Sequence, residues 1–97
     1  MTLRIVQEAA AELADAISYY ESIENGLGIR LKEEVRAALA WIAENPELVR
    51  LRPNGYRRMN LKIFPFYLAY AIWEDTIWIL AVAHGARRPE YWIERAP

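Results

Sequence analysis

Residues 66–83, FYLAYAIWEDTIWILAVA, decide the fold that this sequence predicts, because two long apolar runs meet there at two charged residues. The first run is Phe66–Trp73 and the second is Thr76–Ala83, and both are rich in β-branched and aromatic side chains. Two such runs with two residues between them predict a β-hairpin. Because Glu74-Asp75 lacks the glycine that tight hairpin turns prefer, a slightly longer loop is the alternative to a two-residue turn.

The segments before the hairpin supply the other elements of the fold. Leu3–Val6 predicts a first strand, and apolar residues at helical spacing predict a helix over Glu8–Glu24. Asn25-Gly26 ends that helix, and a second apolar stripe follows until Pro46. After a loop, Met59, Leu61 and Ile63 alternate with polar residues and predict a further strand. We therefore expect one α+β domain over residues 1–97, with a strand, an antiparallel helical hairpin on a mostly antiparallel four-stranded sheet (βααβββ), and a short C-terminal turn or helix.

Both faces of the predicted hairpin are apolar. Regular pairing places Ile72 opposite Ile77 and Phe66 opposite Ala83. Two consecutive helices can cover only one face of this sheet, and the aliphatic face suits them. The other face carries alanines with Tyr67, Trp73 and Trp78, and we interpret it as an interface for a partner. The alternative is that the C-terminal segment folds back over this face.

Composition narrows the function classes. The chain has no cysteine and one histidine, so a zinc site would need carboxylates, and we expect no metal and no cofactor. The longest apolar run has eight residues, Phe66–Trp73, which is too short for a membrane span. The N-terminus lacks the apolar stretch of a signal peptide, so the expected location is the cytoplasm.

Charge is distributed unevenly along the chain. Residues 1–48 hold four basic and nine acidic side chains, a balance of −5, whereas residues 49–97 hold eight basic and four acidic ones, a balance of +4. This asymmetry indicates an anionic partner for the C-terminal half or, equally, a solvated basic face.

The chain resembles the RelE/ParE toxin superfamily, and within it the ParE-like, plasmid-stabilization branch. Several short motifs in this order carry the resemblance: Ala16–Glu21, Gly26-Leu27-Gly28, Ile42–Pro46, Arg57-Arg58, Phe64-Pro65-Phe66, Leu80–Gly85 and Arg87–Trp92. The resemblance implies the toxin of a bacterial type II toxin–antitoxin pair. Its partner would be a small antitoxin that wraps the toxin and binds operator DNA itself, so that the toxin meets this DNA only indirectly.

Two activities follow from this resemblance. RelE-like members cut messenger RNA on the ribosome, and ParE-like members block DNA gyrase without catalysis. RNA cleavage needs a proton acceptor, a proton donor and cations near the phosphate. The chain offers His84, Tyr91 and the cations Arg57, Arg58, Lys62, Arg87 and Arg88; as a ribonuclease its catalytic residues would be His84, Arg58, Arg87 and Tyr91.

The chain departs from the nuclease pattern at three positions. Where RNA-cleaving relatives carry an arginine in a strand, this sequence has Tyr67. Ala86 matches a second basic residue, and Trp92 matches a terminal tyrosine, although a shift of one residue would bring Arg87 and Tyr91 into place. We therefore predict a ParE-like inhibitor without enzyme activity, with gyrase as the candidate target. An mRNA endonuclease and an inactive relative that only binds antitoxin are the alternatives.

The stretch 84–92 has a structural interpretation as well. A histidine that ends a strand before Gly85 is typical of a backbone hydrogen bond at a sheet corner. The aromatic residues of Pro89–Trp92 predict a turn that pins the C-terminal segment. Because guanidinium groups pair well with carboxylates, we expect Arg87 and Arg88 to contact the antitoxin; solvated tail charges and contacts to the toxin's target are the alternatives. The predicted partner-binding residues are Arg57, Arg58, Tyr67, Trp73, Trp78, Arg87 and Arg88.

Overall fold

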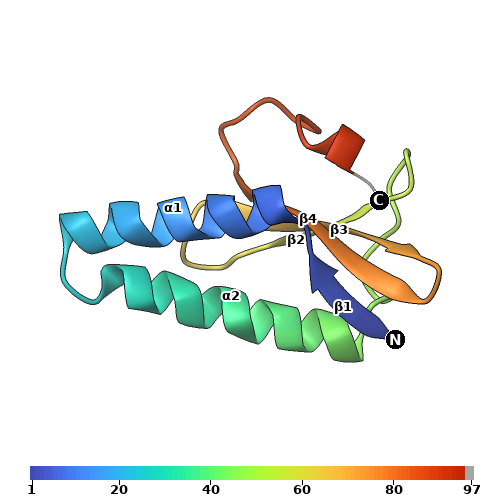
Figure 1. Cartoon of the computed structure of the whole chain (residues 1–97), viewed down its shortest axis with the longest axis horizontal. Coiled ribbons are helices and arrows are strands. Elements are labelled where there is room, and N and C mark those ends of the chain that lie inside the picture. The colour runs from blue at the N-terminus through green and yellow to red at the C-terminus, as the bar shows by residue number, and fades with distance from the viewer. Residues whose placement is uncertain (96–97) are drawn as a thin grey trace.

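The computed structural model describes residues 1–95 and confirms the predicted α+β class and element order. Figure 1 shows the two helices side by side and a C-terminal segment that leaves the end of the last strand. The elements are β1 (Thr2–Ile5), α1 (Gln7–Ile23), α2 (Leu27–Glu44), β2 (Arg57–Asn60), β3 (Phe66–Trp73), β4 (Thr76–His84) and a 3-10 turn, η1 (Ile93–Arg95).

The four strands form one sheet in the order β1-β4-β3-β2. β1 runs parallel to β4, and the other two pairs are antiparallel. The predicted strand around Met59–Ile63 is shorter in the structure and ends at Asn60. The backbone N–H groups of Lys62 and Ile63 donate to the carboxylate of Glu34 on α2, at 2.7 and 3.2 Å, instead of continuing the ladder. A side chain on a distant helix therefore ends this strand.

The β3–β4 hairpin has the two-residue turn and one irregularity. Glu74 and Asp75 both have positive φ, 49° and 58°, which is the geometry of a type I′ turn even without glycine. Near the turn the predicted register is correct, and Ile72 lies opposite Ile77. Beyond it a β-bulge shifts the register by one residue, so that Phe66 lies opposite His84 and not Ala83. The prediction of regular pairing was wrong there, because a bulge adds a residue to one strand only.

The bulge changes which side chains share a face. Leu80 and Ala81 are neighbours in sequence, yet both belong to the apolar cluster on the side of the sheet away from the helices. Val82 then packs with the helices, although regular alternation would place it on the other face. One extra residue in β4 therefore re-aims the last third of the strand.

The joint between the helices depends on two glycines and one glutamate. Gly26 has φ of 90°, a left-handed conformation that glycine adopts readily. A Cβ on Gly28 would lie 2.4 Å from the carbonyl oxygen of Ile17, so α1 and α2 approach closely only because this residue is glycine. The carboxylate of Glu21 accepts from the N–H groups of Gly26 and Gly28, at 2.8 and 3.0 Å, and so satisfies the open start of α2.

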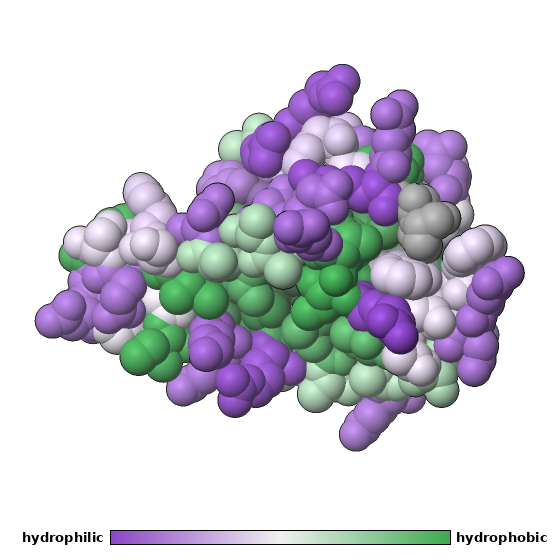
Figure 2. All heavy atoms as spheres, viewed as in Figure 1, coloured by the Kyte–Doolittle hydropathy of each residue, from purple (hydrophilic) through white to green (hydrophobic). Residues whose placement is uncertain are grey.

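The sheet has a different cover on each face. We call the side that packs on the helices the helix face; its buried core includes Leu31 and Ile42 of α2 and Leu68, Ile77 and Ile79 of the hairpin. Hydrophobic surface also gathers between α1 and α2, with hydrophilic side chains around it (Figure 2). We call the opposite side the tail face, with the buried residues Tyr56, Tyr67, Ala69, Leu80, Ala81, Ala83 and Trp92.

The C-terminal segment returns over the tail face, which was the alternative interpretation of the sequence. Tyr67 is 3% exposed because Trp92, itself 1% exposed, lies against it. Trp78 is half-buried, whereas Trp73 at the hairpin end is 53% exposed. The expectation that this whole face lacks a cover within the chain was therefore wrong at Tyr67, although it still applies at Trp73.

Candidate functional site

The chain after β4 forms the centre of the candidate site. We call residues 85–95 the tail. Gly85 donates its N–H to the carbonyl oxygen of Pro65 at 2.8 Å, and the N–H of Arg87 donates to the carbonyl oxygen of His84 at 3.1 Å. These two bonds turn the chain out of the sheet. The tail then crosses the ends of α1 and β4 and brings its charged side chains to a carboxylate on α1.

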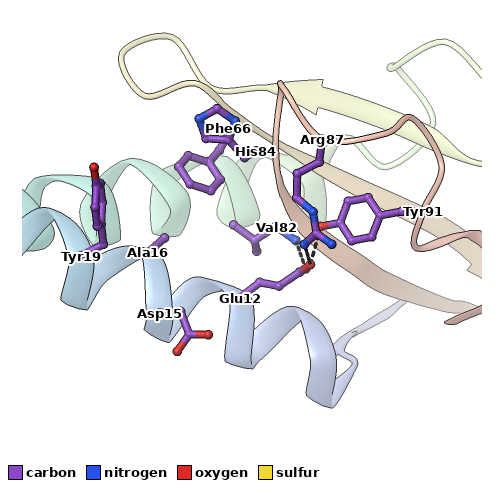
Figure 3. Close-up of a pocket in the computed structure, with 9 residues that line it drawn as sticks. All are labelled: Glu12, Asp15, Ala16, Tyr19, Phe66, Val82, His84, Arg87 and Tyr91. Carbon is purple, nitrogen blue, oxygen red and sulfur yellow. Dashed lines mark hydrogen bonds and ion pairs between the residues drawn. The ribbon is translucent and has the colours of Figure 1, made fainter.

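That carboxylate belongs to Glu12 and gathers donors from the tail and the sheet. Its Oε1 accepts from Arg95 Nη1 at 2.9 Å and from the N–H of Val82 at 3.1 Å. Its Oε2 accepts from the hydroxyl of Tyr91 and lies 3.7 Å from Arg87 Nη1. Figure 3 shows Glu12 pointing from α1 toward Arg87 and Tyr91. Because the Glu12 side chain is only 15% exposed, these charge-assisted bonds are stronger than surface pairs.

The phenol of Tyr91 is perturbed by this arrangement. Burial, then the hydrogen bond to Glu12 and its negative charge, raise the pKa of Tyr91 to about 12. The guanidinium of Arg87 stacks over the Tyr91 ring at 3.7 Å, and that of Arg95 lies 5.2 Å from the same ring. Tyr91 therefore keeps its proton at neutral pH and donates a hydrogen bond to Glu12, so that it acts as a structural donor.

A shallow cleft lies between α1, β4 and the tail. Its lining includes His84, Arg87 and Tyr91, three of the four residues proposed for a ribonuclease. His84 accepts a hydrogen bond at Nδ1 from the N–H of Ala86 at 3.0 Å, so its neutral ring carries the proton on Nε2. Its ring also meets Phe66 edge-on, with centroids 5.2 Å apart. His84 thus has the backbone bond expected of a residue at a sheet corner.

The other predicted arginines lie apart from this cleft. Arg57 donates from Nε to the carbonyl oxygen of Val49 at 2.9 Å. Arg58 stacks on Tyr67, with its Cζ 3.8 Å from the ring centroid, and its Nε donates to Asn60 at 3.0 Å. Arg58 is therefore on the tail face and does not line this cleft, although a second pocket is lined by both Arg58 and His84. Arg88 is exposed and does not line the cleft.

A second set of contacts joins the tail to the tail face. The indole N–H of Trp92 donates to the Tyr67 hydroxyl at 2.9 Å, and its ring meets Tyr56 edge-on at 4.6 Å. Two residues earlier, Glu90 accepts from the Tyr56 hydroxyl at 2.9 Å and from Asn54 at 3.1 Å. The predicted pinning of the tail by Pro89–Trp92 thus agrees with these contacts.

Sequence reasoning missed the two carboxylates that hold the tail. Glu12 lies 79 positions before Tyr91, and Glu90 lies 34 positions after Tyr56. Glu12 belongs to no short motif, and α1 carries other acidic residues with the same local pattern. Glu90 lies within the motif Arg87–Trp92, but that motif gives no sign of the contact with Tyr56. The uneven charge was the one available signal, because Glu12 is in the acidic half whereas Arg87 and Arg95 are in the basic half. Part of that asymmetry is therefore satisfied within the chain.

Among residues 1–95, no three carboxylate, histidine or cysteine side chains come together as a metal ion would require. In the same range, no helix is long and apolar enough to cross a membrane.

Comparison with known proteins identifies the family. A family model described as the ParE toxin of the type II toxin–antitoxin system parDE matches residues 3–89. The chain belongs to the ParE toxin family. The chain is thus a toxin component of a type II toxin–antitoxin system, and the predicted ParE-like branch is confirmed. A search of curated proteins found no match.

A solved structure agrees with this ParE fold. The structure titled "Chromosomal ParDE TA system from P. aeruginosa" is similar with a TM-score of 0.74 and 20% identity, over 87% of this chain and 95% of that one. At this identity the likeness concerns the fold alone. The family model ends at residue 89, within the tail. Trp92 and Arg95 therefore lie beyond the matched range.

Proposed function

We propose that this ParE-family toxin is neutralised by direct binding of a cognate antitoxin and that it acts on its own target by binding and not by catalysis. The observation that carries the non-enzymatic part concerns Tyr67. This residue stands where RNA-cleaving relatives have an arginine, and its ring is covered by Trp92. Tyr67 itself therefore offers a phosphate no positive charge, and its ring stays covered while the tail is docked. DNA gyrase is the candidate target.

We propose that the antitoxin binds the exposed cations and aromatic rings around the tail. The side chain of Arg87 is 57% exposed although it faces Glu12, so it can pair with a second carboxylate. Trp73 offers a large exposed ring at the hairpin end. The full proposed set is Arg57, Arg58, Trp73, Trp78, Arg87 and Arg88, with Tyr67 as a member only when the tail moves.

Expression without the antitoxin separates the main alternatives. A gyrase inhibitor should stop growth, and the purified chain should lower DNA supercoiling by gyrase in vitro. Toxicity with unchanged supercoiling would remove gyrase as the target. Normal growth would favour the inactive relative, and co-purification with the product of an adjoining small gene would then still report antitoxin binding.

The antitoxin contact has a test of its own. Arg88 lies outside the contacts that hold the tail, so Arg88→Ala should leave the fold intact and weaken antitoxin binding by about tenfold, as expected for a lost interfacial cation. The matched control is Arg36→Ala, which removes an exposed arginine from α2. Equal affinity for the two variants would contradict the proposed contact.

The ribonuclease remains a second candidate because His84, Arg87 and Tyr91 line one cleft. A ribosome-dependent nuclease should produce cleaved messages soon after induction, and His84→Ala should abolish them. Full toxicity of the His84→Ala variant with intact messages would exclude this candidate.

A further inference from the structure

Beyond Arg87, the tail is attached to the body of the protein by side chains. From Arg88 to Arg95, backbone hydrogen bonds stay within that segment in the described chain. The bonds to the rest of the protein use the side chains of Glu90, Tyr91, Trp92 and Arg95. Undocking this segment would therefore break no sheet ladder, and it can open without unfolding the core.

The surface beneath the tail has the form of a pocket for an aromatic ring. Ala69, Ala81 and Ala83 form its small-residue floor, while Tyr56 and Tyr67 stand beside the indole of Trp92. The rings meet edge-on, at interplanar angles of 82° and 69°. The alanines leave room for a large ring, and the Tyr67 hydroxyl gives that ring an acceptor for an N–H donor.

The same surface also binds a carboxylate beside the ring. Asn54 and the hydroxyl of Tyr56 both donate to Glu90, which precedes Trp92 by two residues. Arg52 lies close enough to Tyr56 to lower its pKa, although burial and Glu90 outweigh this and raise it overall. Arg58 adds a second positive charge over Tyr67. The surroundings therefore favour an anion next to an aromatic group.

We propose that the tail face is a binding site for a partner segment that carries an aromatic side chain and, two residues before it, a carboxylate, and that this segment binds by displacing the chain's own tail. The tail occupies the site within the chain and so displays the chemistry that the site accepts. The inference rests on these contacts and not on the proposed antitoxin or target.

Glu12 controls the fraction of molecules in which the tail is undocked and the partner segment can bind. Three tail side chains, Arg87, Tyr91 and Arg95, converge on its carboxylate. A ligand that binds only the open form has an apparent affinity reduced by the fraction of open molecules. Weakening the hold of Glu12 raises that fraction and should strengthen partner binding, although Glu12 lies outside the ring pocket itself.

The test uses the full-length chain and a short fluorescent peptide, acetyl-Pro-Glu-Phe-Trp-Ile-amide. This probe keeps the carboxylate and the indole of the tail but lacks the groups that contact Glu12. Fluorescence polarisation should show that the Glu12→Gln variant binds the probe about tenfold more tightly than the unaltered chain. Trp92→Ala, which empties the ring pocket, should also bind more tightly. A control peptide with alanine in place of tryptophan should bind to none of these three proteins.

The matched control protein is Asp15→Asn, which removes a carboxylate one turn along the same helix. It should bind the probe like the unaltered chain. Hydrogen exchange should be faster in Glu12→Gln for residues 86–95 and unchanged for α2. Equal probe affinity in the unaltered chain and in Glu12→Gln would overturn the proposal. So would hydrogen exchange in which the amides of the tail and of α2 exchange together, because the tail would then open only when the core unfolds. If Trp92→Ala does not fold, the Glu12→Gln comparison still decides.

Discussion

The two faces of one sheet are covered in different ways. On the helix face, long aliphatic side chains such as Leu68 and Ile79 pack against Leu31 and Ile42 of α2, and all four are essentially inaccessible. On the tail face, one indole covers alanines and two tyrosine rings. Burial energy grows with apolar area, so the helix face supplies most of the hydrophobic stability.

The difference also concerns how each cover is attached. The helices are held by their connections to the sheet and by the close approach at Gly28. The tail continues from β4 at Gly85 and is held by side-chain hydrogen bonds to Glu12 of α1 and from Asn54 and Tyr56 to its own Glu90. A cover with polar attachments can be exchanged for water or for a partner with similar groups. If the tail opens as proposed, one hairpin supports a permanent core on one face and a removable cover on the other.

The largest expected effect is on the helix face. Leu68→Ala should lower the free energy of unfolding by about 3 kcal/mol, because it leaves a cavity among fully buried side chains. Chemical denaturation measures this loss, which should appear equally in all probes of unfolding. If Leu68→Ala destabilised only the docking of the tail and left the global free energy of unfolding unchanged, the helix face would not be the permanent core.

Trp92→Ala should cost less, although Trp92 is as buried as Leu68. In a fixed core the change costs about 3–5 kcal/mol. Here we expect a loss of about 1–2 kcal/mol, because the docking free energy of the tail limits what its removal can cost. The same denaturation experiment measures it. If Trp92→Ala lowered the free energy of unfolding by about 3–5 kcal/mol, as in a fixed core, both covers of the sheet would be permanent.

Tyr91→Phe should weaken tail docking by about 1 kcal/mol, since it removes a donor to a carboxylate. The effect depends on pH. Burial and Glu12 raise the pKa of Tyr91 to about 12 from 10.0, so the docked state holds its proton more tightly than the open state. Docking is fully favoured below pH 10 and weakens as pH rises from 10 to 12.

Hydrogen exchange of the tail or Trp92 fluorescence follows this titration. Tyr91→Phe should lose that part of the pH dependence, whereas Tyr19→Phe, which changes an exposed ring on α1, should keep it. Burial and Glu90 also raise the pKa of Tyr56, so a smaller dependence should persist in Tyr91→Phe. An identical profile in all three proteins would contradict the role of Tyr91.

The smallest expected effect concerns the turn that both faces share. Asp75 has φ of 58°, which costs a non-glycine residue more than glycine. Asp75→Gly should therefore raise the free energy of unfolding by about 0.5 kcal/mol, because the strain relieved exceeds the entropy that glycine adds to the unfolded chain. Tail exchange should not change. A coupled change in both would indicate that the faces do not open separately.

Local patterns predicted most of the fold. The hairpin at Phe66–Trp73 and Thr76–Ala83 was predicted almost residue for residue, because apolar runs and turn position act over a few residues. The bulge at Leu80 was not predicted, because alternation of side chains carries no mark of an inserted residue. The end of β2 was missed for a similar reason, since the bonds to Glu34 join segments 28 and 29 positions apart.

The candidate site was predicted less well than the fold. His84, Arg87 and Tyr91 were named and do share a cleft. The sequence drew attention to cations and aromatic rings, whereas the acids that orient them, Glu12 and Glu90, carry no local signature. Tyr67 was assigned to an exposed interface because the sequence does not show that the C-terminal segment folds back and covers its ring.

Two apolar faces on the hairpin, and two helices that can cover one of them, follow from local patterns, because side-chain alternation and helical spacing are short-range properties of the chain. What covers the second face depends on the packing of distant segments. That choice depends on whether Glu12, Tyr56 and Tyr67 come within bonding distance of a segment that is far away in sequence. Such distances follow from how the sheet, helix and tail pack together.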